Sequence, residues 1–137
     1  MSNFEKNLEQ AINNAKRLTD KILIDGKLIS AQTNNKIPVL NPSTGDNIGS
    51  APQCNKHDVN IAVESAHKAF QKWKKIPARE RGKMVAAGAK RLEERKSEIE
   101  TLLSLDTGNA LRTQAIPETA ASIELTNMFA GLSGELK

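Results

Sequence analysis

The sequence predicts an α+β segment in which an N-terminal helix is followed by β-hairpin strands and then by three to four amphipathic helices. Two observations favour this order. Asp25-Gly26 and Asn41-Pro42-Ser43-Thr44-Gly45 are turn-forming sequences, and each separates short β-prone runs in the first part of the chain. From Asn55 onward, apolar residues instead recur at helical spacing over long stretches.

Composition allows one domain with a modest core. The chain has 137 residues, and aromatic residues make up only 3% of them, so Leu, Ile, Val and Ala must supply most of the core. The net charge of +4 is a weak indication of a polyanionic partner. The single cysteine excludes an internal disulfide and fits a reducing compartment. With no signal-like or membrane-spanning apolar run, we expect a cytoplasmic protein and no membrane partner.

We expect residues 1–20 to form one amphipathic helix, set apart from residues 21–137. Its apolar stripe consists of Phe4, Leu8, Ile12, Ala15 and Leu18. Residues 21–24 then form a short strand, and Leu28 and Ile29 begin the return strand of a hairpin. Residues 37–40 and 48–51 predict a second pair of strands, with Pro38 favouring an edge position because it lacks an N–H.

Helix boundaries follow from capping residues. Asn55 predicts the N-cap of a helix whose apolar face runs from Val59 to Trp73. A second helix should start near Ala78, pause at Lys96 and restart with the capping-box pattern Ser97-x-x-Glu100. Gly108 fits the residue that ends it, and Pro117 suits the first turn of a last helix. That helix takes its apolar face from Ala121, Leu125, Met128 and Leu132.

The residues that could carry chemistry are few. Cys54 precedes a predicted helix N-terminus, where a thiol pKa can fall, but with no histidine partner in sight a connector cysteine is the favoured interpretation. His57 and His67 lie too far apart in sequence for a helical metal pair. No dinucleotide fingerprint or phosphate loop is present. We therefore assign no catalytic residue and no cofactor-binding residue to this chain.

Residues 68–83 are strongly basic, and Trp73 lies among them. A small standalone interaction module that binds nucleic acid is therefore the alternative function. The favoured interpretation is a solvated helix end, because Trp73 falls on the apolar stripe and no second aromatic is placed to stack on a base.

An ordered series of short motifs is more specific than any of these residues. It includes Leu23-Ile24-Asp25-Gly26-Lys27, Asn41-Pro42-Ser43-Thr44-Gly45-Asp46, Ala66-x-x-Ala69-Phe70, Pro77-Ala78-x-x-Arg81, Leu105-Asp106-Thr107-Gly108-Asn109 and Phe129-Ala130-Gly131-Leu132. In this order and spacing, the series closely resembles the start of the NAD(P)+-dependent aldehyde dehydrogenase superfamily, over roughly residues 21–137.

The resemblance implies an α/β parent fold, of which residues 21–137 are an incomplete N-terminal part of the coenzyme-binding domain. It implies an intact enzyme that oxidises an aldehyde to a carboxylic acid with NAD or NADP and assembles as a homo-oligomer. The catalytic residues of the family lie further along the chain than residue 137. We therefore expect this segment alone to be inactive and to bind no coenzyme, and we expect its helices to expose apolar faces that await the missing partner.

The resemblance also implies one site on this segment. Some members of the family bind a monovalent cation, K or Na, through positions that correspond to the backbone carbonyl of Leu40 and the carboxylate of Asp106. Oxygen ligands of this kind suit a hard cation. A local role for Asp106 at its helix end is the simpler alternative.

Overall fold

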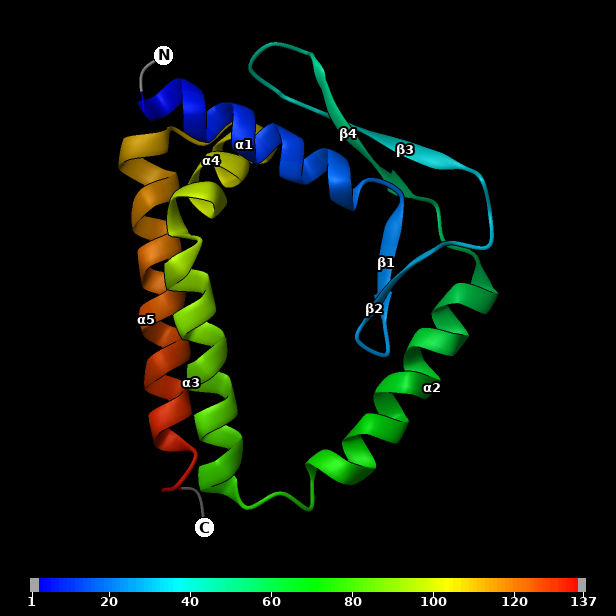
Figure 1. Ribbon diagram of the computed structural model, residues 1–137, viewed down its shortest axis with the longest axis vertical. Coiled ribbons are helices and arrows are strands. Elements are labelled where there is room, and N and C mark those ends of the chain that lie inside the picture. The colour runs from blue at the N-terminus through cyan, green and yellow to red at the C-terminus, as the bar shows by residue number, and fades with distance from the viewer. Residues whose placement is uncertain (1–2, 136–137) are drawn as a thin grey trace.

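The computed structural model describes residues 3–135, and the chain forms an open ring (Figure 1). Helix α1 (Asn3–Leu18) and two β-hairpins lie along one side of the ring. Helix α2 (Lys56–Trp73) descends from the hairpins, and the paired helices α3 (Ala78–Glu94) and α5 (Ile116–Leu132) form the opposite side. The N-terminal helix, the strands and the four following helices were predicted in this order.

Helix α1 packs against helix α4 (Lys96–Thr107) and strand β4 (Asn47–Pro52). On α1, Ala11 is fully buried, while Leu8, Ile12 and Ala15 of the predicted stripe are half-buried. The side chains of Phe4 and Leu18 lie outside the described residues. Ala11 was not in the predicted stripe, and its small side chain allows the close approach of a neighbouring helix.

Both hairpins form where the turn sequences predict them. Strands β1 (Lys21–Ile24) and β2 (Lys27–Ser30) pair antiparallel around Asp25 and Gly26, and both turn residues have positive φ, as a type I′ turn requires. Strands β3 (Lys36–Leu40) and β4 (Asn47–Pro52) form a separate antiparallel pair, with an irregularity in register at the Val39–Leu40 step. Pro38 therefore has a place in a two-stranded sheet, where every strand is an edge.

Helix α2 (Lys56–Trp73) starts at Asn55, as predicted. The Asn55 side chain accepts from the Asp58 N–H, and the Asp58 carboxylate accepts from the Asn55 N–H, both at 3.0 Å. Asp58 is buried and also accepts from the backbone N–H of Gln32 at 3.0 Å. The cap therefore fixes the start of α2 to the loop that follows β2.

Helix α3 (Ala78–Glu94) ends and helix α4 (Lys96–Thr107) begins at Arg95, close to the predicted break. The predicted capping box was wrong, because Ser97 lies inside the first turn and its carbonyl accepts from Thr101 Oγ1 at 2.8 Å. The Arg95 guanidinium instead donates two hydrogen bonds to the Glu98 carboxylate, at 2.9 and 2.6 Å. This pair, helped by a bond from Asn14, holds the pKa of the Glu98 carboxyl below its ordinary value.

A π-helical turn, Leu111–Ala115, precedes helix α5 (Ile116–Leu132) and was not predicted. Pro117 lies at the start of α5 as expected. Helix α5 runs antiparallel to α3, and the closest approach is at Gly82, where an added Cβ would lie 2.5 Å from the Ala130 carbonyl oxygen. The buried side of α5 consists of Thr119, Ile123 and Ala130, and the predicted face is the one left exposed.

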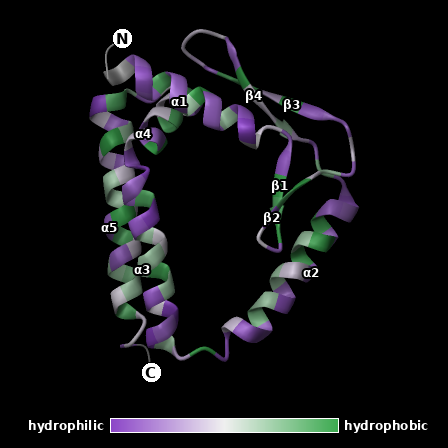
Figure 2. Ribbon diagram, viewed as in Figure 1, coloured by the Kyte–Doolittle hydropathy of each residue, from purple (hydrophilic) through white to green (hydrophobic). Residues whose placement is uncertain are grey.

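Uncovered apolar faces are the main feature of the packing, as the resemblance led us to expect. The buried hydrophobic residues are mostly small, namely Ala11, Ala89, Ala115, Ile123 and Ala130. Larger side chains remain exposed on α2, α3 and α5, including Val63 at 62% and Phe129 at 63%. Figure 2 shows hydrophobic residues along all three helices. The chain therefore buries little of its own apolar surface.

Candidate functional site

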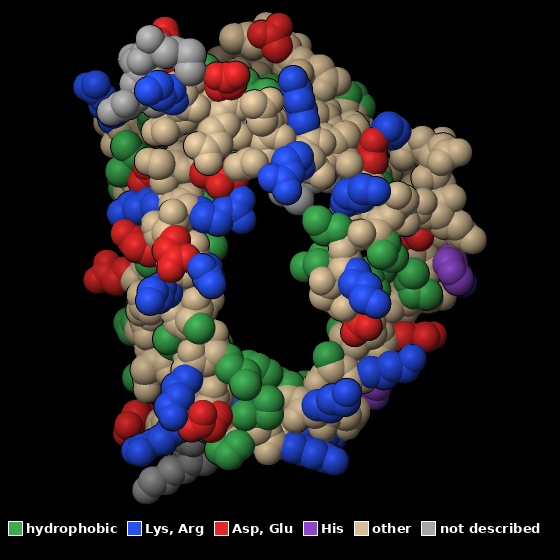
Figure 3. All heavy atoms as spheres, viewed as in Figure 1, with side chains coloured by type: hydrophobic (Ala, Val, Ile, Leu, Met, Phe, Trp, Pro, Cys, Tyr) green, Lys and Arg blue, Asp and Glu red, His purple; other side chains and the backbone are tan. Residues whose placement is uncertain are grey.

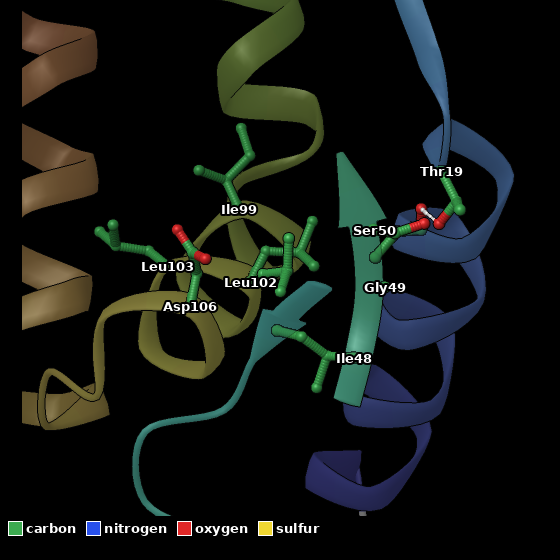
Figure 4. A pocket seen from close by; sticks show the side chains of 10 residues that line it. Thr19, Ile48, Gly49, Ser50, Ile99, Leu102, Leu103 and Asp106 are labelled. Carbon is green, nitrogen blue, oxygen red and sulfur yellow. Dashed lines mark hydrogen bonds between the residues drawn. The ribbon is translucent and has the colours of Figure 1, made fainter. Parts of the chain in front are cut away.

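The Asp106 pocket lies where α1, the β3–β4 hairpin and α4 meet, and its volume is about 430 Å³. Its walls are apolar: Ile99, Leu102 and Leu103 come from α4, and Ile48 comes from β4 (Figure 4). Asp106 supplies the one carboxylate among the residues that line it. A carboxylate beside an apolar wall can pair with a cation that enters the pocket.

The two predicted cation-site residues, Leu40 and Asp106, lie in the same region of the structure, but they do not form an assembled site. Val39 lines the pocket together with Asp106. Leu40 is the next residue, at the end of β3 opposite Asn47, and its side chain is exposed. Asp106 is also exposed, on the last turn of α4. The arrangement is compatible with the predicted pair of oxygen ligands, and the site itself stays a prediction.

The turn that follows α4 rests on the turn that follows β3. Gly108 ends α4 in the left-handed conformation, with φ of 76°. A Cβ on Gly108 would lie 2.9 Å from Pro42 Cγ. The Leu-Asp-Thr-Gly and Asn-Pro-Ser-Thr-Gly motifs therefore meet in space, although 59 residues separate them in the sequence.

The other candidate residues do not assemble into a site. Cys54 is an exposed free thiol in the connector before α2. His67 Nε2 lies 3.1 Å from Gln71 Nε2 on the next turn of the same helix. Among residues 3–135, no group of His, Cys, Asp and Glu side chains is placed to hold a metal ion.

The basic stretch, residues 68–83, is divided between the end of α2 and the start of α3. Lys74 lies over the Phe70 ring, 5.6 Å from its centroid, and Lys83 pairs with Glu80 at 2.8 Å. Arg81 Nη1 donates to the Ile76 carbonyl oxygen at 3.2 Å. These local contacts support the interpretation of a solvated helix end.

Sequence reasoning missed a polar junction between α1 and the hairpins. Asp20 has a φ of 62°, and its N–H donates to the Ser50 carbonyl oxygen at 3.2 Å. Its carboxylate accepts from the Lys36 ammonium group and from Ser50 Oγ. Hydrogen bonds from Lys36, which has the larger effect, and from Ser50 hold the pKa of the Asp20 carboxyl below its ordinary value. An Asp two residues after the end of α1 was the available signal, since Asp tolerates positive φ.

A wide groove follows one side of α2, with a volume of about 930 Å³. Ala66, Phe70 and Trp73 line it from the helix, and Ile76 lines it from the loop towards α3. Asp25, at the tip of the β1–β2 hairpin, closes the other side. The apolar stripe of α2 was predicted, but the sequence could not show that part of this stripe lines a groove.

Comparison with known proteins identifies the family. The pattern described as the aldehyde dehydrogenase family matches residues 28–137. The chain belongs to the aldehyde dehydrogenase family. It is similar to aldehyde dehydrogenase tropH of Talaromyces stipitatus, with 37% identity over 88% of this chain and 23% of that protein. It is also 33% identical to phenylacetaldehyde dehydrogenase of Pseudomonas fluorescens, over 88% of this chain and 24% of that protein.

Solved structures of the family share the fold. Betaine aldehyde dehydrogenase from Staphylococcus aureus, in complex with NAD+, superposes with a TM-score of 0.85 and 27% identity. The superposition covers 93% of this chain and 26% of that enzyme. This aldehyde dehydrogenase chain therefore spans about a quarter of the length of its relatives and is an N-terminal segment. Within residues 3–135, no helix has the length and apolar character of a membrane span.

Proposed function

We propose that this chain is the N-terminal segment of an NAD(P)+-dependent enzyme that oxidises an aldehyde to a carboxylic acid. The family match along residues 28–137 carries the proposal. The superposition on an enzyme that binds NAD+ supports NAD as the coenzyme. The aldehyde and the choice between NAD and NADP depend on the rest of the chain.

Within that enzyme, the segment acts as a scaffold. Its hairpins and helices form a frame whose apolar faces are left open for the coenzyme-binding core. The segment alone is inactive in this proposal, because nucleophile, base and coenzyme pocket belong to later residues. We also propose that the intact enzyme is a cytoplasmic homo-oligomer, with the single cysteine of this segment fitting a reducing compartment.

A chimeric enzyme tests this proposal. Residues 1–137 would replace the matching N-terminal quarter of the S. aureus betaine aldehyde dehydrogenase, and NADH formation from betaine aldehyde would be followed by absorbance. We expect turnover in the chimera and none in the same enzyme lacking its N-terminal quarter. A soluble chimera that binds NAD+ yet shows no turnover would contradict the proposed role.

We propose further that Asp106 and the Leu40 carbonyl are ligands of a monovalent cation, K or Na, in the intact enzyme. Two observations support this: Asp106 lies with Val39 in the same pocket, and the two motif turns are held together at Gly108 and Pro42. The chimera should unfold at a higher temperature in KCl or NaCl than in tetramethylammonium chloride at equal ionic strength. Asp106→Asn should remove this difference, and an Asp106→Asn chimera that keeps it would show that the cation binds elsewhere.

A further inference from the structure

We propose that Asp25 is a modification site, at which the aspartate converts spontaneously to isoaspartate through a cyclic imide formed with Gly26. The β1–β2 hairpin presents the two groups that this reaction joins, a carboxyl group and the N–H of the following glycine, at its exposed tip. The reaction needs no other component of the proposed dehydrogenase. Its consequence is a hairpin whose strands lose their present register.

Water is the only other reactant. The Gly26 nitrogen attacks Cγ of the protonated Asp25 carboxyl group, so that an N–Cγ bond forms, a Cγ–O bond breaks, and the nitrogen-bound hydrogen leaves with the hydroxyl group as water. Water then adds to one of the two carbonyl carbons of the imide. Opening at Cγ restores aspartate, whereas opening at the backbone carbonyl carbon makes the chain run through Cβ and Cγ, which is isoaspartate. Overall no atom is gained or lost, and no oxidant or reductant is needed.

The Gly26 nitrogen is open to this attack. In the hairpin register Ile24 pairs with Lys27, so the two turn residues lie outside the ladder. Within residues 3–135, no hydrogen bond engages the Gly26 N–H. A Cβ built on Gly26 would meet no atom within 4 Å apart from its chain neighbours, and glycine has no side chain of its own to shield the nitrogen.

The Asp25 carboxylate is not held by any partner in the described part of the chain. It is exposed, and neither a hydrogen bond nor an ion pair fixes it there. Two other aspartates differ: the Asp58 carboxylate is buried and accepts from backbone N–H groups, and the Asp20 carboxylate accepts from Lys36. A carboxylate bonded in this way is kept from the next backbone nitrogen, whereas that of Asp25 can turn towards it.

Ring closure requires rotation about the Cα–C bond of Asp25, which the paired strands restrain. This hairpin resists opening only weakly, because β1 and β2 form a sheet of two strands alone, with Leu23 70% and Leu28 53% exposed. Figure 3 shows hydrophobic side chains at the surface over this hairpin, on the rim of the opening. A two-stranded sheet that buries little apolar surface is marginally stable and opens locally. The reaction therefore proceeds from the opened turn, more slowly than in a free peptide.

Isoaspartate alters the turn that sets the register of the hairpin. It adds one main-chain atom between Cα of residue 25 and the Gly26 nitrogen, so the loop no longer has the length of a two-residue type I′ turn. One carboxylate remains, and the net charge is unchanged. The pairing of Ile24 with Lys27, directly beside the turn, is therefore the first to be lost.

An incubation of the chimera at neutral pH tests this modification, with a peptide of residues 21–30 treated in parallel. Isoaspartate at each position would be located by mass spectrometry with electron-transfer fragmentation. Asp46 is the internal control, because it is also exposed and also lies in the turn of a hairpin, but the side chain of Asn47 shields the next nitrogen. Gly26→Asn is the matched variant, since Asn tolerates positive φ and a Cβ has free space at this position.

We expect isoaspartate to accumulate at position 25 of the chimera, more slowly than in the peptide, and not at position 46. Gly26→Asn should slow this accumulation while leaving the hydrogen exchange of residues 21–30 unchanged before the incubation. The modified fraction should lose amide protection at residues 24 and 27. An unmodified position 25 in the chimera after the peptide has converted would overturn the proposal, and so would equal accumulation at positions 25 and 46.

Discussion

Gly108 rests on Pro42, and this contact joins the turn after α4 to the turn after β3. The relationship makes two independent demands on position 108. The backbone is left-handed there, which disfavours any residue with a Cβ. The space is also closed, because a Cβ would lie 2.9 Å from Pro42 Cγ.

Gly108→Ala should therefore destabilise the junction by about 1–3 kcal/mol, combining backbone strain with the clash. Gly45→Ala is the matched control, since Gly45 has a similar φ of 78° and nothing within 4 Å of its added Cβ. Hydrogen exchange of the amides in residues 41–49 and 104–109 would measure how much protection each of the two variants loses. If the two variants lose the same protection, the contact with Pro42 contributes nothing.

Gly82→Ala should push α3 and α5 apart. Its added Cβ would clash with Ser133 Oγ and would lie 2.5 Å from the Ala130 carbonyl oxygen, and this backbone atom cannot turn away. Overpacking of this kind costs about 1–3 kcal/mol. Gly88→Ala in the same helix meets no atom within 4 Å and should be neutral or stabilising. A lower thermal midpoint in the chimera for Gly82→Ala alone is expected, and equal midpoints would argue against the tight crossing.

Asp20→Asn should change how stability depends on pH. Lys36 and Ser50 lower the pKa of the Asp20 carboxyl from its ordinary value of 3.8. A carboxyl with a depressed folded-state pKa adds stability above its unfolded pKa and loses it as pH falls through the folded pKa. Asn keeps the left-handed backbone but not the charge.

The difference in unfolding free energy between the unsubstituted chimera and its Asp20→Asn variant should therefore be largest near neutral pH and shrink below about pH 4. Urea midpoints at several pH values, read by circular dichroism, would show it. Other carboxyls, including that of Glu98, titrate in both proteins and cancel in the comparison. A difference that does not change with pH would mean that the Asp20 charge is not stabilised by its partners.

Asp58→Ala should release the start of α2. The carboxylate is buried and accepts from the N–H groups of Asn55 and Gln32, which the substitution leaves without this partner. Loss of a capping side chain costs about 0.5–2 kcal/mol, and unsatisfied buried donors add to it. Glu64→Ala, on an exposed position of the same helix, should stay within about 0.5 kcal/mol of the parent. Hydrogen exchange at residues 55–60 would test this, and equal effects of the two substitutions would contradict it.

The order of elements and their boundaries could be predicted because the signals are local. Asp25-Gly26, Asn55 and Gly108 each act through their own backbone conformation or a neighbour within a few residues. The false capping box has a local cause too: Arg95 and Glu98 pair two residues earlier, and Ser97 lies inside the first turn of α4. The π-helical turn before Pro117 has no comparable signature in the sequence.

Contacts between distant residues could not be predicted. The approach of Gly108 to Pro42, the tether from Asp58 to Gln32 and the junction at Asp20 each depend on where whole elements are placed. The side of α5 that packs against the chain could not be predicted either. Apolar residues occur on both sides of this helix, so their periodicity does not indicate which side is buried. The ordered motifs, by contrast, identified the family correctly without any of these contacts.

We propose that the chain is a frame whose exposed apolar faces require the rest of an aldehyde dehydrogenase. Thermal unfolding of the 137-residue chain, followed by circular dichroism with a hydrophobic dye present, tests it most directly. We predict strong dye binding at room temperature and a broad transition, as exposed helix faces produce. Little dye binding and a sharp cooperative transition would show a self-sufficient core and would contradict the account.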